Sequence, residues 1–241
     1  MLLVLALLAA ALPTAYCSTR LVKQYEYEED IHLSLDGSAV IYVNASVPAL
    51  VALRGLALDV APSARLDRTK VRAMYTTPAS SVTRVSTSRR LGRRFVHVRL
   101  EVDDIRRLGA ARPFSWSAYR FDRSDGQYVY QQTVGVSAGN NVGNVGWRGN
   151  EVVAFRLHVP SRIEFHNAGA DNLQRGNILV WERSLAARVT GEPLDMQVRM
   201  QSSSILARTL TLFAVSGLAA LAVLAFLIVM VVRRGRRVDS R

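Results

Sequence analysis

The stretch that decides the fold runs from Val22 to Val47 and reads VKQYEYEEDIHLSLDGSAVIYVNASV. Its first half alternates between apolar or aromatic and polar side chains, which is typical of a half-buried β-strand. The Asp36-Gly37 pair that follows is a strong turn signal, and residues 38–47 are rich in β-branched side chains. The stretch therefore predicts a β-hairpin near the start of the folded region.

The segment after this hairpin changes from a strand period to a helical one. Leucines recur near helical spacing within residues 48–60, and residues 67–75 form a second short helical pattern. Strands return at 81–88 and 95–102, on either side of a turn that contains Gly92. One or two helices are thus expected between the first hairpin and the later strands.

The following part of the chain has the pattern of an all-β region. The Asp125-Gly126 pair marks a second hairpin, and the glycine- and asparagine-rich residues 136–150 predict a long loop. Further strands are expected at residues 114–121, 128–136, 152–159, 163–167, 177–182 and 196–201. The predicted class is α+β, an antiparallel sheet with one or two inserted helices.

The most specific feature is an uncharged stretch at residues 209–232, bounded by Arg208 and Arg233. A helix of this length, at about 1.5 Å per residue, crosses the roughly 30 Å hydrocarbon core of a bilayer. The arginines that follow it favour the cytoplasmic side. We therefore expect one transmembrane helix at 209–232, a basic cytoplasmic tail at 233–241 and an extracytoplasmic domain at 18–208.

Residues 1–17 have the pattern of a secretory signal peptide. Residues 1–12 form an uncharged apolar run that is too short to span a bilayer. Cys17 follows where a bacterial lipoprotein signal places its acylated cysteine, and it is the lipidation candidate. Tyr16 stands where such signals carry a small residue, so cleavage after Cys17 by an ordinary signal peptidase is the alternative. The expected location is the bacterial cell membrane.

The net charge of +12 suggests nucleic acid or an anionic membrane as a partner. The expected topology argues against nucleic acid, because +8 lies outside the cytoplasm and +4 belongs to the tail. Arg89, Arg90, Arg93 and Arg94 crowd one hairpin tip, where forked guanidinium groups suit the phosphate or carboxylate of an anionic ligand. The alternative is that these are ordinary surface cations, since arginine outnumbers lysine 29 to 2.

No local motif indicates catalysis or cofactor binding. The glycine-rich residues 139–149 lack the Lys and Ser/Thr of a phosphate-binding loop and are expected to form a flexible connection. Trp147 and Arg148 within them are candidate contacts for a ligand or partner, because aromatic and arginine side chains favour interfaces.

The four histidines lie in separate predicted strands. His158 and His166 flank Pro160, but no third metal ligand is evident beside them. We therefore expect no enzyme, no metal and no cofactor. An envelope hydrolase, the less favoured class, would require a cleft in which histidines and carboxylates converge.

Three segments of the C-terminal half follow a recognisable order. They are Val159-Pro160-Ser161-Arg162-Ile163, His166-Asn167 and Arg175-Gly176-Asn177-Ile178-Leu179-Val180-Trp181-Glu182. This layout resembles the membrane-proximal hairpin of LppM-like bacterial envelope proteins, where a V-P-G-x-V…N-G…G-N-x-V-x-W pattern precedes a last strand, a spanning helix and a basic tail. The resemblance covers residues 152–237 and the signal; Ser161 replaces the usual Gly, and residues 48–149 hold no matching motif.

The resemblance implies a curved, helix-grip-like sheet in a membrane-tethered, often lipidated protein that binds envelope lipids or glycolipids. We accordingly expect a non-enzymatic, single-pass binding protein with a lipid, glycolipid or protein partner. The alternative is an interaction or assembly subunit of a membrane protein complex with no small-molecule ligand. A deep apolar cavity open toward the membrane would favour the former, and a solid core with an exposed apolar patch the latter.

Replacing Cys17 with serine tests the lipoprotein interpretation. Because the chain has 1 cysteine, any thioether-linked lipid must be attached there. Cys17→Ser is expected to abolish incorporation of labelled fatty acid and to change the electrophoretic migration of the mature protein. A parent protein that incorporates no label, and migrates as the variant does, contradicts the interpretation.

Overall fold

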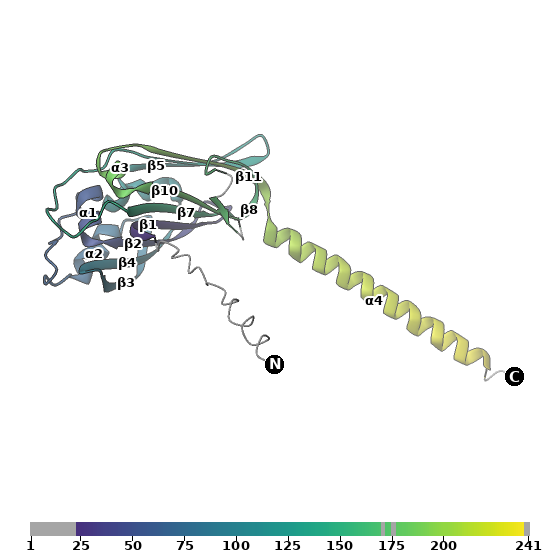
Figure 1. Cartoon of the computed structure of the whole chain (residues 1–241). Helices are drawn as coiled ribbons and strands as arrows, with labels where there is room; N and C mark the ends of the chain where they lie inside the picture. The colour runs from purple at the N-terminus through teal and green to yellow at the C-terminus, as the bar shows by residue number, and fades with distance from the viewer. Residues whose placement is uncertain (1–22, 170–171, 175–176, 239–241) are drawn as a thin grey trace, which may run out of the picture.

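The computed structural model describes residues 23–169, 172–174 and 177–238 (Figure 1). The expected signal peptide and Cys17 lie outside the described residues. Two β-sheets and a few short helices form a layered body, and one long helix projects from it. The α+β class predicted from the sequence is confirmed.

The larger sheet contains the hairpin predicted from residues 22–47. Its strand order is β3-β4-β2-β1-β7-β10-β9. The strands are β1 (Gln24–Leu33), β2 (Ala39–Ser46), β3 (Ser80–Arg90), β4 (Arg93–Val102), β7 (Glu151–His158), β9 (Leu173–Gln174) and β10 (Ile178–Ser184). All neighbours are antiparallel except β1 and β7, which are parallel.

The smaller sheet has the order β5-β6-β11-β8 and is antiparallel throughout. Its strands are β5 (Ser117–Ser124), β6 (Gln127–Val134), β8 (Ser161–His166) and β11 (Leu194–Ser204). Asp125 and Gly126 join β5 to β6 with φ of 52° and 75°, the positive values that a tight hairpin turn requires. Both hairpins predicted from Asp-Gly pairs are thus confirmed.

The architecture differs from the expectation in two respects. The sequence predicted one antiparallel sheet, whereas the structure has two sheets and one parallel pair. The parallel pair arises because the chain leaves the larger sheet after β4, builds the β5–β6 hairpin, and returns as β7 beside β1. Alternation along a strand shows which face is buried but not which distant strand lies next to it.

The short helices follow their local capping signals. Helix α1 (Val47–Arg54) begins after Ser46, whose hydroxyl accepts from the Ala49 amide, and α2 (Arg68–Tyr75) begins after Asp67 in the same way. The expected helix at 48–60 ends early because Gly55 adopts a φ of 61° and closes it. The remaining short helices are η1 (Ile105–Ala110), η2 (Arg112–Phe114) and α3 (Leu185–Val189).

The core lies between the two sheets, with α1 and α2 covering the end of the larger sheet formed by β2, β3 and β4. Most of its side chains are aliphatic or aromatic, but Glu29 of β1 lies at its centre with 0% exposure. Its Oε1 accepts from Tyr119 and Gln132 of the smaller sheet at 2.9 and 2.8 Å. Its Oε2 accepts from Arg54 of α1 at 3.1 Å. This carboxylate therefore joins both sheets and a helix.

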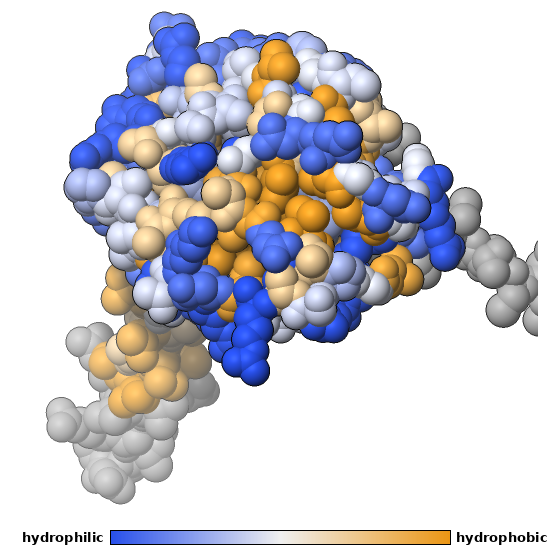
Figure 2. Space-filling model, turned by 90° about the vertical axis from the view of Figure 1, so that its left-hand side faces the viewer, coloured by the Kyte–Doolittle hydropathy of each residue, from blue (hydrophilic) through white to orange (hydrophobic). Residues whose placement is uncertain are grey.

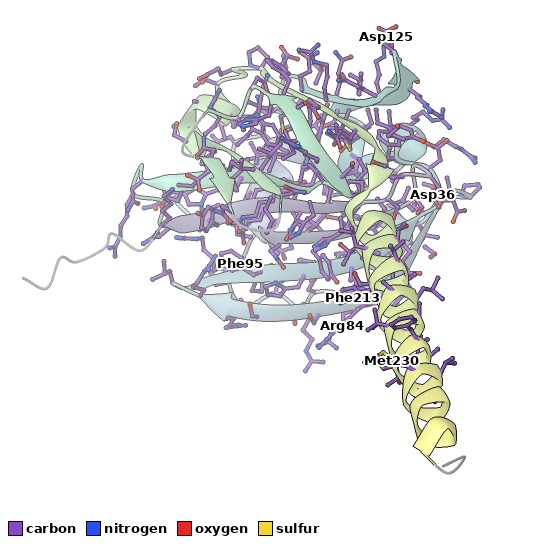
Figure 3. The ribbon with its side chains drawn as sticks, turned by 90° about the vertical axis from the view of Figure 1, so that its right-hand side faces the viewer. Asp36, Arg84, Phe95, Asp125, Phe213 and Met230 are labelled. Carbon is purple, nitrogen blue, oxygen red and sulfur yellow. The ribbon has the colours of Figure 1, made fainter. Side chains whose placement is uncertain are left out.

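Helix α4 (Ile205–Val238) continues directly from β11 and extends away from the sheets (Figure 1). Within it, Thr209–Met230 has a mean hydropathy of 2.8 and is not buried against the rest of the protein. Phe213 and Met230 of this helix are exposed, and both are labelled in Figure 3. This helix is long and apolar enough to cross a membrane, in agreement with the predicted span at 209–232.

Removing the Glu29 carboxylate is expected to destabilise the fold severely. Glu29→Ala leaves the buried Arg54 cation uncompensated and removes the acceptor of three further donors, Tyr27, Tyr119 and Gln132, a loss of about 3–5 kcal/mol in the free energy of unfolding. Urea unfolding of the full chain in detergent, followed by tryptophan fluorescence, measures the change. The control is Asp122→Ala, which removes an exposed carboxylate 3.7 Å from Arg120 and should cost less than about 1 kcal/mol. Equal losses in the two variants contradict the prediction.

Candidate anion-binding site

The β3–β4 hairpin brings together the arginines that the sequence placed at its tip. Leu91 and Gly92 form the turn with φ of 51° and 74°. Arg89 then stands opposite Arg94, and Arg90 stands opposite Arg93, in the antiparallel register. Residues that pair across two strands in this way project on the same side of the hairpin, so the four arginines divide into two pairs.

The Arg89–Arg94 pair lines a pocket of about 470 Å³, which we call the basic pocket. The loop before α2 supplies its other wall. The pocket is lined by Ser63, Ala64, Arg65, Leu66, Arg68, Thr87, Ser88, Arg89 and Arg94. The lining thus includes four arginines and three serine or threonine residues, and it contains no carboxylate.

No acidic side chain among residues 23–169, 172–174 and 177–238 neutralises the charges of these arginines. None of the ion pairs found among the described residues involves Arg65, Arg68, Arg89 or Arg94. A hollow lined by one sign of charge concentrates the field inside it and attracts ions of the opposite sign. The pocket is therefore electrostatically suited to an anion.

Arg94 forms the base of the basic pocket. Its side chain is buried, and its guanidinium donates to the backbone carbonyl of Ala64 at 2.8 Å and to that of Asp59. These two bonds fix the loop that carries Arg65. The Nε atom of Arg94 is buried and has no hydrogen-bond partner, which leaves one donor at the base of the pocket unsatisfied.

The other pair, Arg90 and Arg93, lies next to the turn and makes contacts that hold the fold together. Arg93 is buried and donates to Glu26 at 2.8 and 3.1 Å and to the carbonyl of Gly146 at 2.9 Å. Arg90 donates to the Tyr25 carbonyl at 2.6 Å and lies over the ring of Phe95. Of the four arginines singled out in the sequence, the structure thus brings Arg89 and Arg94 to the basic pocket.

The two candidate contacts in the glycine-rich loop also have internal roles. The Trp147 indole packs against the core and donates to Glu26 at 3.2 Å. The Arg148 amide donates to Glu151 at 2.7 Å, while its side chain remains exposed. The loop is therefore attached to the domain through Glu26 and Glu151, and the structure places neither residue in the basic pocket.

An apolar groove of about 330 Å³ adjoins the basic pocket. Its walls are the residues just before Ser63 in the same loop, the β3–β4 turn, and the glycine-rich loop. It is lined by Pro48, Val60, Ala61, Pro62, Leu91, Gly92, Arg93, Val142, Asn144 and Val145. Leu91 is 55% exposed, and Figure 2 shows apolar side chains gathered at this end of the molecule. The end of the domain opposite α4 thus combines an apolar groove with a basic pocket (Figure 1).

Two further arginines, Arg54 and Arg188, are buried in the core, and nothing in the sequence indicated their position. The guanidinium carbons of Arg54 and Arg188 lie 3.2 and 4.8 Å from the Trp116 ring. Burial, together with repulsion by Arg54, lowers the pKa of Arg188 to about 10. Arg188 donates to the backbone carbonyls of Gly135 and Glu192, so it ties β6 to the α3–β11 connection.

Arg65 and Arg68 were also missed in the sequence. The signal that could have identified them is their position on either side of Asp67, the cap of α2. Only the packing of this loop against β3 and β4 places them beside Arg89. Local spacing along the chain therefore could not have assembled the site.

No model of a protein family matches the sequence, and no curated protein matches it. Among solved structures, the folded domain of LppM from Mycobacterium tuberculosis, determined by NMR, has a TM-score of 0.39 and 12% sequence identity. The similarity covers 76% of this chain and 94% of that domain. It is a weak resemblance of fold. The structure itself defines an α+β domain joined to one apolar helix, with a basic pocket at its far end.

Proposed function

We propose that the protein is a membrane-anchored binding protein whose extracytoplasmic domain holds an anionic amphiphile, a lipid or glycolipid with a phosphate or carboxylate headgroup. The observation that carries this proposal is the basic pocket, where four arginines that form no ion pair within the described part of the chain adjoin an apolar groove. The headgroup would occupy the pocket and the start of an acyl chain the groove.

The chemistry of the lining supports this assignment. Guanidinium groups present paired N–H donors that match two oxygens of a phosphate or carboxylate, and serine or threonine hydroxyls donate to the others. The pocket and the groove, at about 470 and 330 Å³, are within the usual size of small-ligand sites. Arg94 contributes its positive charge at the base of the pocket, where the carbonyls of Ala64 and Asp59 hold its guanidinium in place.

The lining also supports binding rather than catalysis. The basic pocket contains no histidine, cysteine or carboxylate, the side chains that most often serve as nucleophiles or general acids and bases. The imidazole of His97 lies 2.7 Å from the Ser88 hydroxyl, but the other ring nitrogen of His97 is bonded to the amide of Asn44 and not to a carboxylate. We therefore propose a non-enzymatic role for this site.

The proposed topology places the pocket away from the bilayer that holds the anchor. Helix α4 leaves the domain at the end opposite the β3–β4 turn (Figure 1), and the basic tail at 233–241 favours the cytoplasmic side. The ligand would therefore be a single amphiphile that has left this bilayer, or one in a facing layer of the envelope.

The alternative is an interaction subunit that binds another protein and no small ligand. Two observations favour it: the space between the sheets is filled by side chains, and the exposed Leu91 and Val136 lie at the apolar end of the domain. An apolar patch bordered by polar residues is typical of protein interaction sites. In this case the groove, rather than the arginines, would determine binding.

Binding of short-chain phospholipids to the full chain in detergent tests the proposal. We expect dihexanoyl phosphatidic acid to bind saturably, and dihexanoyl phosphatidylcholine to bind at least about tenfold more weakly. Replacing Arg65, Arg68 and Arg89 together with alanine should weaken phosphatidic acid binding at least about tenfold, since each charge-assisted hydrogen bond contributes roughly 1.5–3 kcal/mol.

The matched control is the triple alanine variant at Arg84, Arg120 and Arg123, which removes the same charge from exposed positions outside the pocket. It should bind as the parent protein does. Equal binding of the two lipids, or equal loss in both triple variants, contradicts the proposal and leaves the interaction subunit as the better interpretation.

Protease accessibility tests the proposed topology. Protease added to cells with a permeabilised outer envelope and an intact inner membrane should digest the domain at 18–208 and leave an epitope fused to the C-terminus protected. Digestion of the epitope with protection of the domain would show that the protein has the opposite orientation and would contradict the proposed topology. The same cells lysed in detergent serve as the control, because both segments should then be cut.

A further inference from the structure

Two of the four histidines meet on the outer face of the larger sheet. His32 of β1 and His158 of β7 are directly paired in the parallel register, although they are far apart in the sequence. Their ring centroids lie 3.7 Å apart with an interplanar angle of 19°. His166, which flanks Pro160 together with His158 in the sequence, lies in the smaller sheet instead.

A carboxylate completes this cluster. Asp30 lies two residues before His32 and therefore on the same face of β1. Its Oδ1 is 3.0 Å from Nε2 of His158 and 3.6 Å from Nε2 of His32. This oxygen is buried, yet it accepts no hydrogen bond. The His158 ring nitrogen is within ion-pairing distance of this oxygen but is not aligned to donate to it, so a buried carboxylate oxygen lies between two ring nitrogens without a well-formed hydrogen bond.

We propose that Asp30, His32 and His158 bind a divalent transition-metal ion of the Zn²⁺ class. Their donor atoms all lie within 4.8 Å of one another. With metal–ligand distances near 2.1 Å, the ligand atoms of a tetrahedral zinc site are separated by about 3.4 Å. The observed separations of 3.0 and 3.6 Å from Asp30 to the two histidines lie on either side of this value.

The surroundings suit a site with one open coordination position. Two imidazoles and a carboxylate supply three protein ligands, and the partly exposed cluster leaves the fourth position to water or to a further group. Tyr42 stands edge-on to the His32 ring at 5.4 Å and limits its orientation. One of the stacked rings must turn about its Cβ–Cγ bond so that both nitrogens point at the same ion.

The site is separate from the proposed anion-binding site. The β3–β4 turn of the basic pocket is at the same end of the larger sheet as Ser46, whereas His32 and Ala39 lie toward the opposite end. After His158 the chain turns into β8, where Ser161 pairs with Ser204, the last residue before α4. The metal would therefore bind at the end of the domain from which the membrane helix leaves, and its loss should not affect binding in the basic pocket.

Metal titration of the full chain in detergent tests the proposal. After removal of metals with a chelator, Zn²⁺ is titrated against a competing chromophoric chelator, and Co²⁺ is added separately to record its visible absorption. We expect one Zn²⁺ per chain and the intense absorption of four-coordinate Co²⁺. His158→Gln and Asp30→Asn should each weaken Zn²⁺ binding at least about tenfold.

His97→Gln is the matched control, because His97 is a partly buried histidine of the same sheet, bonded to Asn44 and Ser88. It should leave Zn²⁺ affinity and the Co²⁺ spectrum unchanged. Circular dichroism of each variant shows whether it is folded. Because His158→Gln and Asp30→Asn change different strands, the test still stands if one of the two variants fails to fold. Absence of saturable binding in the parent, or equal loss in the His97 variant, overturns the proposal.

Discussion

The buried carboxylate of Glu29 is the interaction on which the rest of the structure depends. It accepts hydrogen bonds from Tyr119 and Gln132 of the smaller sheet and from Arg54 of α1, while its own backbone is part of the larger sheet. A charge in the core is tolerated only when it is paired and fully hydrogen-bonded. The two sheets and the helix must therefore take the positions that bring these donors to one point.

A similar requirement divides the arginines of the domain. Arg54 and Arg93 face Glu29 and Glu26 in the interior, and Arg188 donates to backbone carbonyls. Arg65, Arg68 and Arg89, by contrast, extend around a hollow whose lining has no acid. The same residue type thus stabilises the fold at one place and supplies positive charge for a ligand at another. The difference lies in the partners that the fold provides, because every guanidinium carries the same charge.

Much of the architecture could be predicted from local patterns, and the candidate sites could be predicted in part. The Asp-Gly turns, the short helix at residues 67–75 and the apolar segment of α4 depend on residues close together in the sequence, and all were found as expected. The second sheet and the parallel pairing of β1 with β7 were not predicted, because the alternation of apolar and polar residues along a strand does not identify the strand beside it. Arg89 and Arg94 were singled out, but their separation from Arg90 and Arg93 depends on contacts with distant loops.

The sequence by itself determined the class of fold, the hairpin at residues 22–47, the long apolar helix and the concentration of arginine at one turn. These are properties of periodicity, turn chemistry and composition, which act over a few residues. Only the tertiary structure decided that Glu29 is shared between the two sheets, which arginines have no acidic partner among the described residues, and that His32 lies against His158. Such features depend on register and burial across the whole chain, because the free energy of a charged or polar side chain is set by the groups that folding brings to it.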